Sequence, residues 1–411
     1  MNISSSLLPM DKIMWLKSLI LVVAFGLLPG IAAAAQVSIF ASFKPDPSQP
    51  MRNVFKNETP PGDSYCGWAP QYCHSDRYSI GAPITFRLAQ TIQPGHDERQ
   101  GVMFRAPTYR QNVTVIHEET GESQTLQFRV SGIGMGITDR PEEPGTWETS
   151  WTYPPAPCVN NGTAVGSPAI YLFTYFLAEG AEGCAIRAAK PVSLLTFRSF
   201  GFAYELVTPN PLGMRVGIYR GQTTYSVGPN KDFDLGDVML PDDDQITLDF
   251  RLTVEHTLKV DIPPGGTNVE LVPQGGWQGW LNQGRKPTRL FKDQTVNLYV
   301  SSRFKMGLDC QYADADNDCR IRDSVSGESV PVNVSVSLPY GISDAAGRPV
   351  NRQPLRRDGV GTELFQPTFY VDRKPSTLHF EIERDEVEKM LKVGESRAYS
   401  GNITVIWDSE V

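Results

Sequence analysis

Apolar residues recur at every second position through most of the chain, which is the pattern of β-strands with one buried face. The longest alternating run begins at Ile246 and continues to Ile262, where Pro263-Pro264-Gly265-Gly266 ends it and Val269 resumes it. The stretch 170–177 is almost continuously apolar, as expected of a strand that is buried on both faces. Further strands are predicted at 113–115, 126–130, 296–308, 330–338, 378–382 and 403–407.

Helical periodicity is confined to 384–392, where Val387, Met390 and Leu391 fall on one side. The 32 prolines and 36 glycines supply turns at the density that an all-β sandwich needs. The chain is longer than a typical single domain, and a short acidic stretch at 240–244 precedes the longest strand. The sequence therefore predicts an all-β protein of two β-sandwich domains, at 36–245 and 246–411.

The first 35 residues have the order of a secretory signal peptide, and either Met1 or Met10 can be its start. Lys12 and Lys17 form the basic part, an apolar run follows at 18–30, and small residues precede an expected cleavage after Ala35. The apolar run is too short to span a bilayer comfortably. We therefore expect the protein to be exported through the periplasm.

Six cysteines follow the signal peptide and fall into three local pairs, Cys66 with Cys73, Cys158 with Cys184, and Cys310 with Cys319. An even count in an exported chain indicates disulfides, and sequential pairing is the simplest of the possible connectivities because each pair closes a short segment. A metal site is the alternative, but the pairs lack C-x-x-C spacing and the histidines lack ligand spacing. We predict no metal and no cofactor.

Charge and motifs argue against nucleic-acid binding and against catalysis. The net charge of −8 is unfavourable for a phosphate backbone. His117-Glu118-Glu119 begins like a zincin motif, but Gly121 stands where the second histidine belongs. The acidic run 314–318 begins like a calcium loop, but Cys319 and Val325 replace its glycine and its glutamate. We predict that the protein is not an enzyme, and that His256 is a hydrogen-bonded core residue.

Aromatic residues near the first two cysteine pairs are candidates for a receptor site. An amphipathic ring offers a flat apolar face and a polar group, as a glycan or peptide site requires. The alternative is that these rings fill the core or cover the ends of a sandwich. The candidates are Tyr65, Trp68, Tyr72, Trp147, Trp151 and Tyr153, whereas Trp277 and Trp280 are expected to be structural.

The last predicted strand carries Ile403, Val405 and Trp407 on one face and polar Asn402, Thr404 and Asp408 on the other. A sandwich domain that stops at such a strand resembles a chaperone–usher pilin domain. The segment 55–66, and the stretches 256–260, 275–277 and 330–332, resemble the two-domain tip adhesins of that family. Many pilins have a penultimate aromatic residue, whereas this sequence ends Ser409-Glu410-Val411.

The resemblance implies an immunoglobulin-like second domain that lacks its last strand. A periplasmic chaperone, and then an adjacent subunit, would fill the resulting groove by strand addition, and Ile403, Val405 and Trp407 would line it. The chaperone would be needed because an unfilled strand edge is prone to aggregation. The resemblance implies an outer-membrane usher as a further partner.

The resemblance also implies that the first domain binds a glycan or protein receptor at the fimbrial tip. Two alternatives remain. The chain could be a minor structural subunit whose first domain only caps or spaces the fibre, or it could be a secreted β-sandwich glycan hydrolase.

Overall fold

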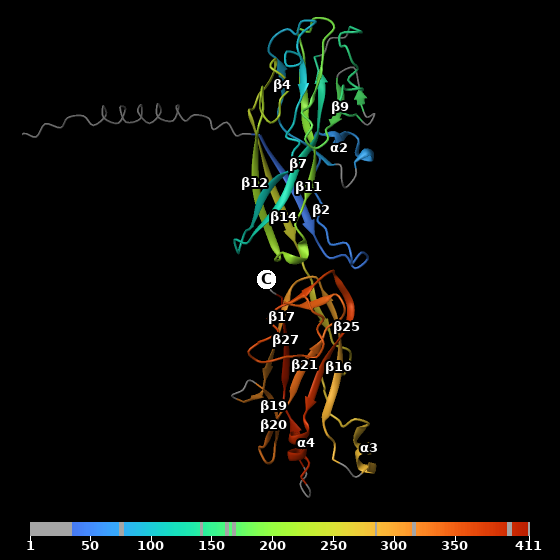
Figure 1. The fold of residues 1–411 in the computed structure, drawn as a ribbon, viewed down its shortest axis with the longest axis vertical. Coiled ribbons are helices and arrows are strands. Elements are labelled where there is room, and N and C mark those ends of the chain that lie inside the picture. Colours follow the sequence, from blue (N-terminus) through green and yellow to red (C-terminus); the bar gives the residue numbers. More distant parts are fainter. Residues whose placement is uncertain are drawn as a thin grey trace, which may run out of the picture.

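The computed structural model describes residues 35–73, 78–139, 143–160, 164–166, 170–283, 286–314, 318–392 and 397–409. Its strands form two bodies that follow one another along the long axis of the molecule (Figure 1). The all-β prediction is confirmed, and the predicted signal peptide lies almost entirely outside the described residues. Within those residues, no helix has the length and apolarity needed to cross a membrane.

The first domain is built on one large sheet in the order β13-β4-β11-β7-β6-β12-β14-β1-β2, with β3, β8 and β9 joined beside it. The predicted hairpin is formed by β6 and β7, with Val113 opposite Leu126, and the predicted strand at 170–177 is β9. The bounds are β1 Ala35–Phe43, β2 Lys56–Asn57, β3 Tyr78–Gly81, β4 Phe86–Leu88, β6 Gln111–His117, β7 Ser123–Thr138, β8 Ala164–Gly166, β9 Tyr171–Phe176, β11 Thr196–Val207, β12 Gly217–Ser226, β13 Met239–Pro241 and β14 Gln245–Val254. A separate pair consists of β5 (Val102–Phe104) and β10 (Cys184–Ile186).

The strand β1 runs parallel to β14, the last strand of the domain, in register from Ala35 opposite Ile246 to Phe43 opposite Val254. On its other side, β14 pairs with β12 in antiparallel fashion. The first and last strands of the domain therefore lie next to each other, although about two hundred positions separate them along the chain.

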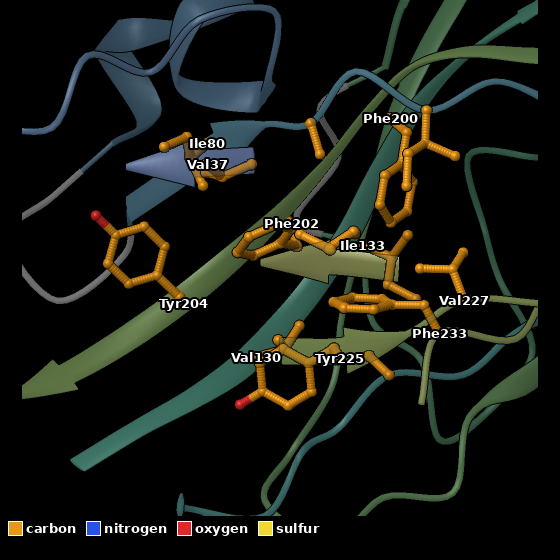
Figure 2. Packing of buried hydrophobic residues seen from close by; sticks show 14 of the residues in the cluster. Val37, Ile80, Val130, Ile133, Phe200, Phe202, Tyr204, Tyr225, Val227 and Phe233 are labelled. Carbon is orange, nitrogen blue, oxygen red and sulfur yellow. The ribbon is translucent and has the colours of Figure 1, made fainter. Parts of the chain in front are cut away.

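Aromatic rings fill the core of the first domain. Figure 2 shows Phe233 among Phe200, Phe202 and Tyr225. Its ring centroid lies 5.5, 5.6 and 5.9 Å from theirs, and all four rings are at most 2% exposed. Contacts of this kind add roughly 0.5–1.5 kcal/mol per pair beyond the burial of apolar area.

The alternating run that begins at Ile246 belongs to two domains. Its first part is β14, whose inward residues Ile246 to Val254 pack in the core of the first domain. Its second part is β15 (Leu258–Asp261), which pairs with β16 of the second domain. The chain thus passes between the domains at 255–257, and the predicted seam after residue 245 is too early, because the pattern alternates through the crossing without interruption.

The second domain is a sandwich of two sheets, β15-β16-β25-β21-β23 and β22-β24-β17-β27, with a smaller sheet of β18, β19, β20 and β26. The bounds are β16 Leu290–Val300, β17 Phe304–Cys310, β18 Tyr312–Ala313, β19 Cys319–Asp323, β20 Ser329–Pro331, β21 Asn333–Ser337, β22 Ile342–Asp344, β23 Gln353–Pro354, β24 Phe365–Pro367, β25 Val371–Ile382, β26 Tyr399–Ser400 and β27 Ile403–Ser409. The runs predicted as single strands at 296–308 and 330–338 each divide between two sheets, because both sheets face one core and the alternation continues across the corner.

Helices are few. The predicted helix is α4 (Arg384–Met390), and α2 (Tyr65–Trp68) is a single turn at the first disulfide. The sequence did not predict α3 (Gly276–Gln283), because Gly275 and Gly276 suggest a turn; both have positive φ, at 79° and 76°. All three predicted disulfides are present, at Cys66–Cys73, Cys158–Cys184 and Cys310–Cys319.

Candidate functional site

The strand β27 lies at the edge of its sheet. It pairs with β17 along its whole length, from Ile403 opposite Cys310 to Ser409 opposite Phe304. Within the described ranges, its other edge pairs with no strand. An edge of this kind presents a row of backbone N–H and C=O groups to which another strand can bond.

The inward side chains of β27 are incompletely covered. Ile403, Val405 and Trp407 point toward the core and pack against it, yet all three are only partly buried. On the neighbouring strand β17, the inward residues Phe304, Met306 and Leu308 are 0, 2 and 5% exposed. Trp407 stacks on Phe304, with 5.8 Å between the ring centroids. Within the described chain, β27 therefore has an unpaired backbone edge and inward apolar side chains that are only partly covered.

The facing sheet also ends in an edge strand with partly buried residues. In the described chain β15 pairs only with β16, and its Leu258 and Val260 are half-buried. Beyond β15, the chain leaves the sheet through the Pro263–Gly266 turn and returns where Val272 bonds Phe291, with N···O distances of 3.2 and 3.0 Å.

A cavity of about 800 Å³ opens between the two sheets at this side of the sandwich. The facing sheet contributes Leu290 and Ile382, and β27 contributes Ile403. The apolar wall also includes Ile321, Val332 and Phe380. Five further apolar residues of the wall are only partly buried, namely Val269, Leu271, Trp277, Met390 and Leu391. We name this cavity, together with the open edge of β27, the acceptor groove.

A carboxylate anchors the segment that leads into β27. Asp323 accepts hydrogen bonds from the Ser326 amide and hydroxyl, both at 2.7 Å, and from the Ala398 amide at 2.9 Å. These bonds lower the pKa of Asp323 to about 2, the Ser326 amide being the largest cause. Glu328 binds Arg397 beside it, which lowers the pKa of Glu328. These bonds hold the segment 397–398, which precedes β27 and forms part of the wall of the acceptor groove. The sequence did not predict this role for Asp323 and Glu328.

The aromatic receptor candidates divide into buried and accessible residues. Tyr65 is 4% exposed and packs edge-to-face on Phe176, with 5.7 Å between the centroids. Trp151 is 8% exposed and belongs to the core of the first domain. A buried ring offers no surface to a receptor, so these two have the structural role that was the alternative.

The other candidates lie in two segments, Trp68 and Tyr72 inside the Cys66–Cys73 loop and Trp147 and Tyr153 before Cys158. Trp68 is partly buried and donates from Nε1 to Asp63 at 2.6 Å, and Trp147 packs 5.0 Å from Trp151. Tyr153 is 73% exposed. The side chain of Tyr72 lies outside the described residues.

The motif-like histidine and acidic residues have structural partners. His117 is 2% exposed, and its Nε2 lies 2.8 Å from the Val216 carbonyl oxygen. Asp314 pairs with Arg320 at 2.7 Å, and residues 315–317 of the acidic loop lie outside the described chain. Within the described ranges, no three His, Cys, Asp or Glu side chains are grouped as metal ligands would be.

His256 lies at the domain junction instead of inside a strand. Its Nε2 is 2.9 Å from the Met214 carbonyl oxygen in the first domain, and its Nδ1 is 3.2 Å from Ser301 Oγ in the second. Burial lowers the pKa of His256. The hydrogen-bonded role is as predicted, but the residue joins two domains rather than packing within one.

No family model and no curated protein matches the chain. Similar solved structures include CfaE, the adhesive subunit of CFA/I fimbria of enterotoxigenic Escherichia coli, at 11% identity and a TM-score of 0.25, covering 92% of this chain and 94% of that one. Another is from the CsuC–CsuE chaperone–tip adhesion subunit pre-assembly complex of the archaic chaperone–usher Csu pili of Acinetobacter baumannii, at 8% identity and a TM-score of 0.23, covering 91% and 99%. At such values the function has to be argued from the geometry of the chain itself. Over nine-tenths of its length, the chain is similar to tip adhesins of chaperone–usher fimbriae.

Proposed function

We propose that the chain is a fimbrial tip adhesin whose second domain accepts a β-strand from an adjacent subunit and whose first domain binds a surface receptor. One observation carries the proposal: the inward residues of β27 are half-buried at the same edge where its backbone has no neighbour within the described chain. A strand added there would satisfy both the backbone groups and the apolar side chains.

The apolar surface gives the scale of the gain. Full burial of a large apolar side chain is worth about 1.5–3 kcal/mol, so covering the exposed part of Ile403, Val405 and Trp407, about a third or less of each, contributes at most about 1 kcal/mol each. The alternate residues of the donor strand add their own burial in the acceptor groove. Before that strand arrives, a periplasmic chaperone would cover the groove and deliver the chain to the outer-membrane usher, because an exposed apolar edge invites aggregation.

The first domain has the features of an independent recognition module. Its sheet includes both its own first and last strands, β1 and β14, and its aromatic core is separate from that of the second domain. It therefore needs no donor strand. Its surface carries the accessible ring of Tyr153 and a cavity on one flank, and its receptor is a glycan or a protein on the host or another surface.

The test is to express the chain in the periplasm with and without a donor peptide fused through a short linker after Val411. The matched control is the same peptide with its alternating apolar residues changed to Ser. We expect the apolar donor to raise the soluble yield and to slow amide exchange at 403–409, and the Ser donor to do neither. Equal yield and equal exchange for all three proteins would overturn the proposal.

A further inference from the structure

A cavity of about 980 Å³ lies on the flank of the first domain. One wall is the segment 44–57, which includes β2, and the other is the end of β11 from Tyr204 to Thr208. Its size is that of a small-molecule site. It is separate from the acceptor groove, and none of its lining residues belongs to the aromatic candidates predicted from the sequence.

The cavity is basic in a chain whose net charge is −8. Its lining includes the cations Lys44, Arg52, Lys56 and Arg110, together with the carboxylates Asp46 and Glu205. Both carboxylates have partners within the protein.

Two arginines hold Glu205. Arg129 Nε donates to it at 2.9 Å and Arg110 Nη2 at 2.5 Å, and the bonds from Arg129 are the largest cause of its lowered pKa. Asp46 accepts from the Ser48 amide at 2.8 Å and from the Ser48 hydroxyl at 2.7 Å, which lowers the pKa of Asp46. The acidic groups of the cavity are therefore already engaged.

Arg110 pairs with both Glu205 and Glu179, and Lys56 lies 4.0 Å from Glu58. The other two cations are less fully engaged. Arg52 donates to the neutral Gln49 Oε1 at 3.4 Å. In the described chain it forms no ion pair within 4.0 Å, although, after the bonds from Ser48, its charge contributes to the lowered pKa of Asp46. Lys44 pairs with Glu255 at 3.3 Å, but the two side chains are 77% and 57% exposed. Exposed pairs of this kind are worth at most about 1 kcal/mol, so a bound anion can replace them.

The base of the cavity is rigid and partly apolar. The Tyr204 hydroxyl bonds Asn57 Nδ2 at 2.8 Å and Thr59 Oγ1 at 3.1 Å, and its ring lies 5.7 Å from that of Tyr78. Val54 and Val207 are 53% and 47% exposed at the rim. The amide of Tyr370 in the second domain donates to the Pro50 carbonyl at 3.1 Å, which fixes the outer wall.

We propose that this cavity binds an acidic saccharide, whose carboxylate or sulfate group is held by Arg52 with Lys44 and Arg110 nearby and whose apolar face lies against Val54 and Val207. A guanidinium that forms no direct ion pair among the described residues matches the anionic group, and rings and methyl groups beside fixed polar atoms match a sugar. The inference rests on the proposed receptor-binding role of the first domain and names the class of its ligand.

The experiment is a calorimetric titration of the donor-complemented full chain with N-acetylneuraminic acid, galactose 6-sulfate and neutral galactose. We expect binding of one or both acidic sugars, weakening as NaCl is raised, and weaker binding of galactose. Arg52→Gln should lower the affinity for the acidic sugar at least about tenfold, because it removes a charge-assisted bond. Arg52→Lys should retain part of the affinity.

Arg357→Gln is the matched control, since it removes the same charge from an exposed position in the second domain. Cell attachment by the same proteins separates this inference from the proposed function. If wild type and Arg52→Gln attach equally and no acidic sugar binds, the cavity proposal is wrong and the adhesin proposal stands. If the wild type does not attach to any cell or glycan surface, the adhesin proposal fails first. Equal binding of acidic and neutral sugars also overturns the cavity proposal.

Discussion

Truncation of Trp407 should destabilise the chain more when a donor strand is present than when it is absent. The ring is partly buried at the acceptor groove and stacks on Phe304. Replacing a fully buried aromatic residue by Ala costs about 3–5 kcal/mol, so a ring that is about two-thirds covered is worth roughly 3 kcal/mol. A donor strand that covers the remainder should bring the cost of Trp407→Ala to roughly 4 kcal/mol.

The assay is urea unfolding of the chain with and without the fused donor peptide, followed by tryptophan fluorescence and far-UV circular dichroism. Met306→Ala is the matched control, because Met306 lies directly opposite Trp407 on β17 and is 2% exposed. Its cost, about 2–5 kcal/mol, should be the same in both proteins, since the residue is already covered. An equal cost of Trp407→Ala in both proteins would refute the reasoning, because it would mean that the donor does not cover this edge.

Three other predictions concern titratable groups. The pKa of Asp323 is lowered to about 2, below its ordinary value near 3.9, so its stabilising contribution is present above about pH 4 and lost as the pH falls toward 2. Asp323→Asn should therefore flatten the fall in melting temperature over that range; an unchanged slope would contradict this. His379 is 7% exposed and joins three strands through Asp293 at 2.6 Å and Ser337 at 2.8 Å. His379→Leu should cost roughly 2 kcal/mol in urea unfolding, and an unaltered midpoint would show that the bonds contribute nothing. Burial lowers the pKa of His256 in the folded chain, so the unfolded chain binds a proton at this residue more readily than the folded chain does. The contribution of the neutral ring to the stability of the fold is therefore lost as the pH falls below about 6.5. The Thr257 amide donates to Ser301 Oγ, and its hydrogen exchange should change from pH 7 to pH 5 toward faster exchange than the intrinsic pH dependence of exchange gives. His256→Gln should not show this extra acceleration. Equal behaviour of the two proteins would argue against the role of His256 at the domain junction.

The sequence predicted strands well because alternation is a local property. It predicted β6, β7, β9, β25 and β27 and the inward face of β27 from the spacing of apolar residues alone. It could not locate the changes of sheet after Val300 and Pro331, because an inward residue of either sheet meets the same core. The parallel pairing of β1 with β14 was also hidden, since nothing in either segment specifies a partner so far along the chain.

For the candidate sites too, the sequence predicted what depends on a local pattern and missed what depends on contacts between distant segments. Ile403, Val405 and Trp407 were predicted as lining residues, whereas Val269 and Leu271 reach the acceptor groove only because the chain leaves the sheet after β15. Composition gave no means to separate Trp151, which is buried, from Tyr153, which is 73% exposed two residues later. The basic cavity was missed because the segment 44–57 and its opposite wall at 204–208 are about 150 positions apart along the chain.

In the proposed role of the chain, held between a receptor and a fibre, the pairing of β14 would have a mechanical consequence. A pull on the second domain enters the first at Val254, where β14 ends, and acts along the axis of that strand. The strand is flanked over its length by β1 and β12, with nine and ten paired positions. Force along the strand axis loads these hydrogen bonds together in shear instead of opening them one after another. In the proposed role, the load would therefore enter the first domain through a strand whose hydrogen bonds on both edges resist it together.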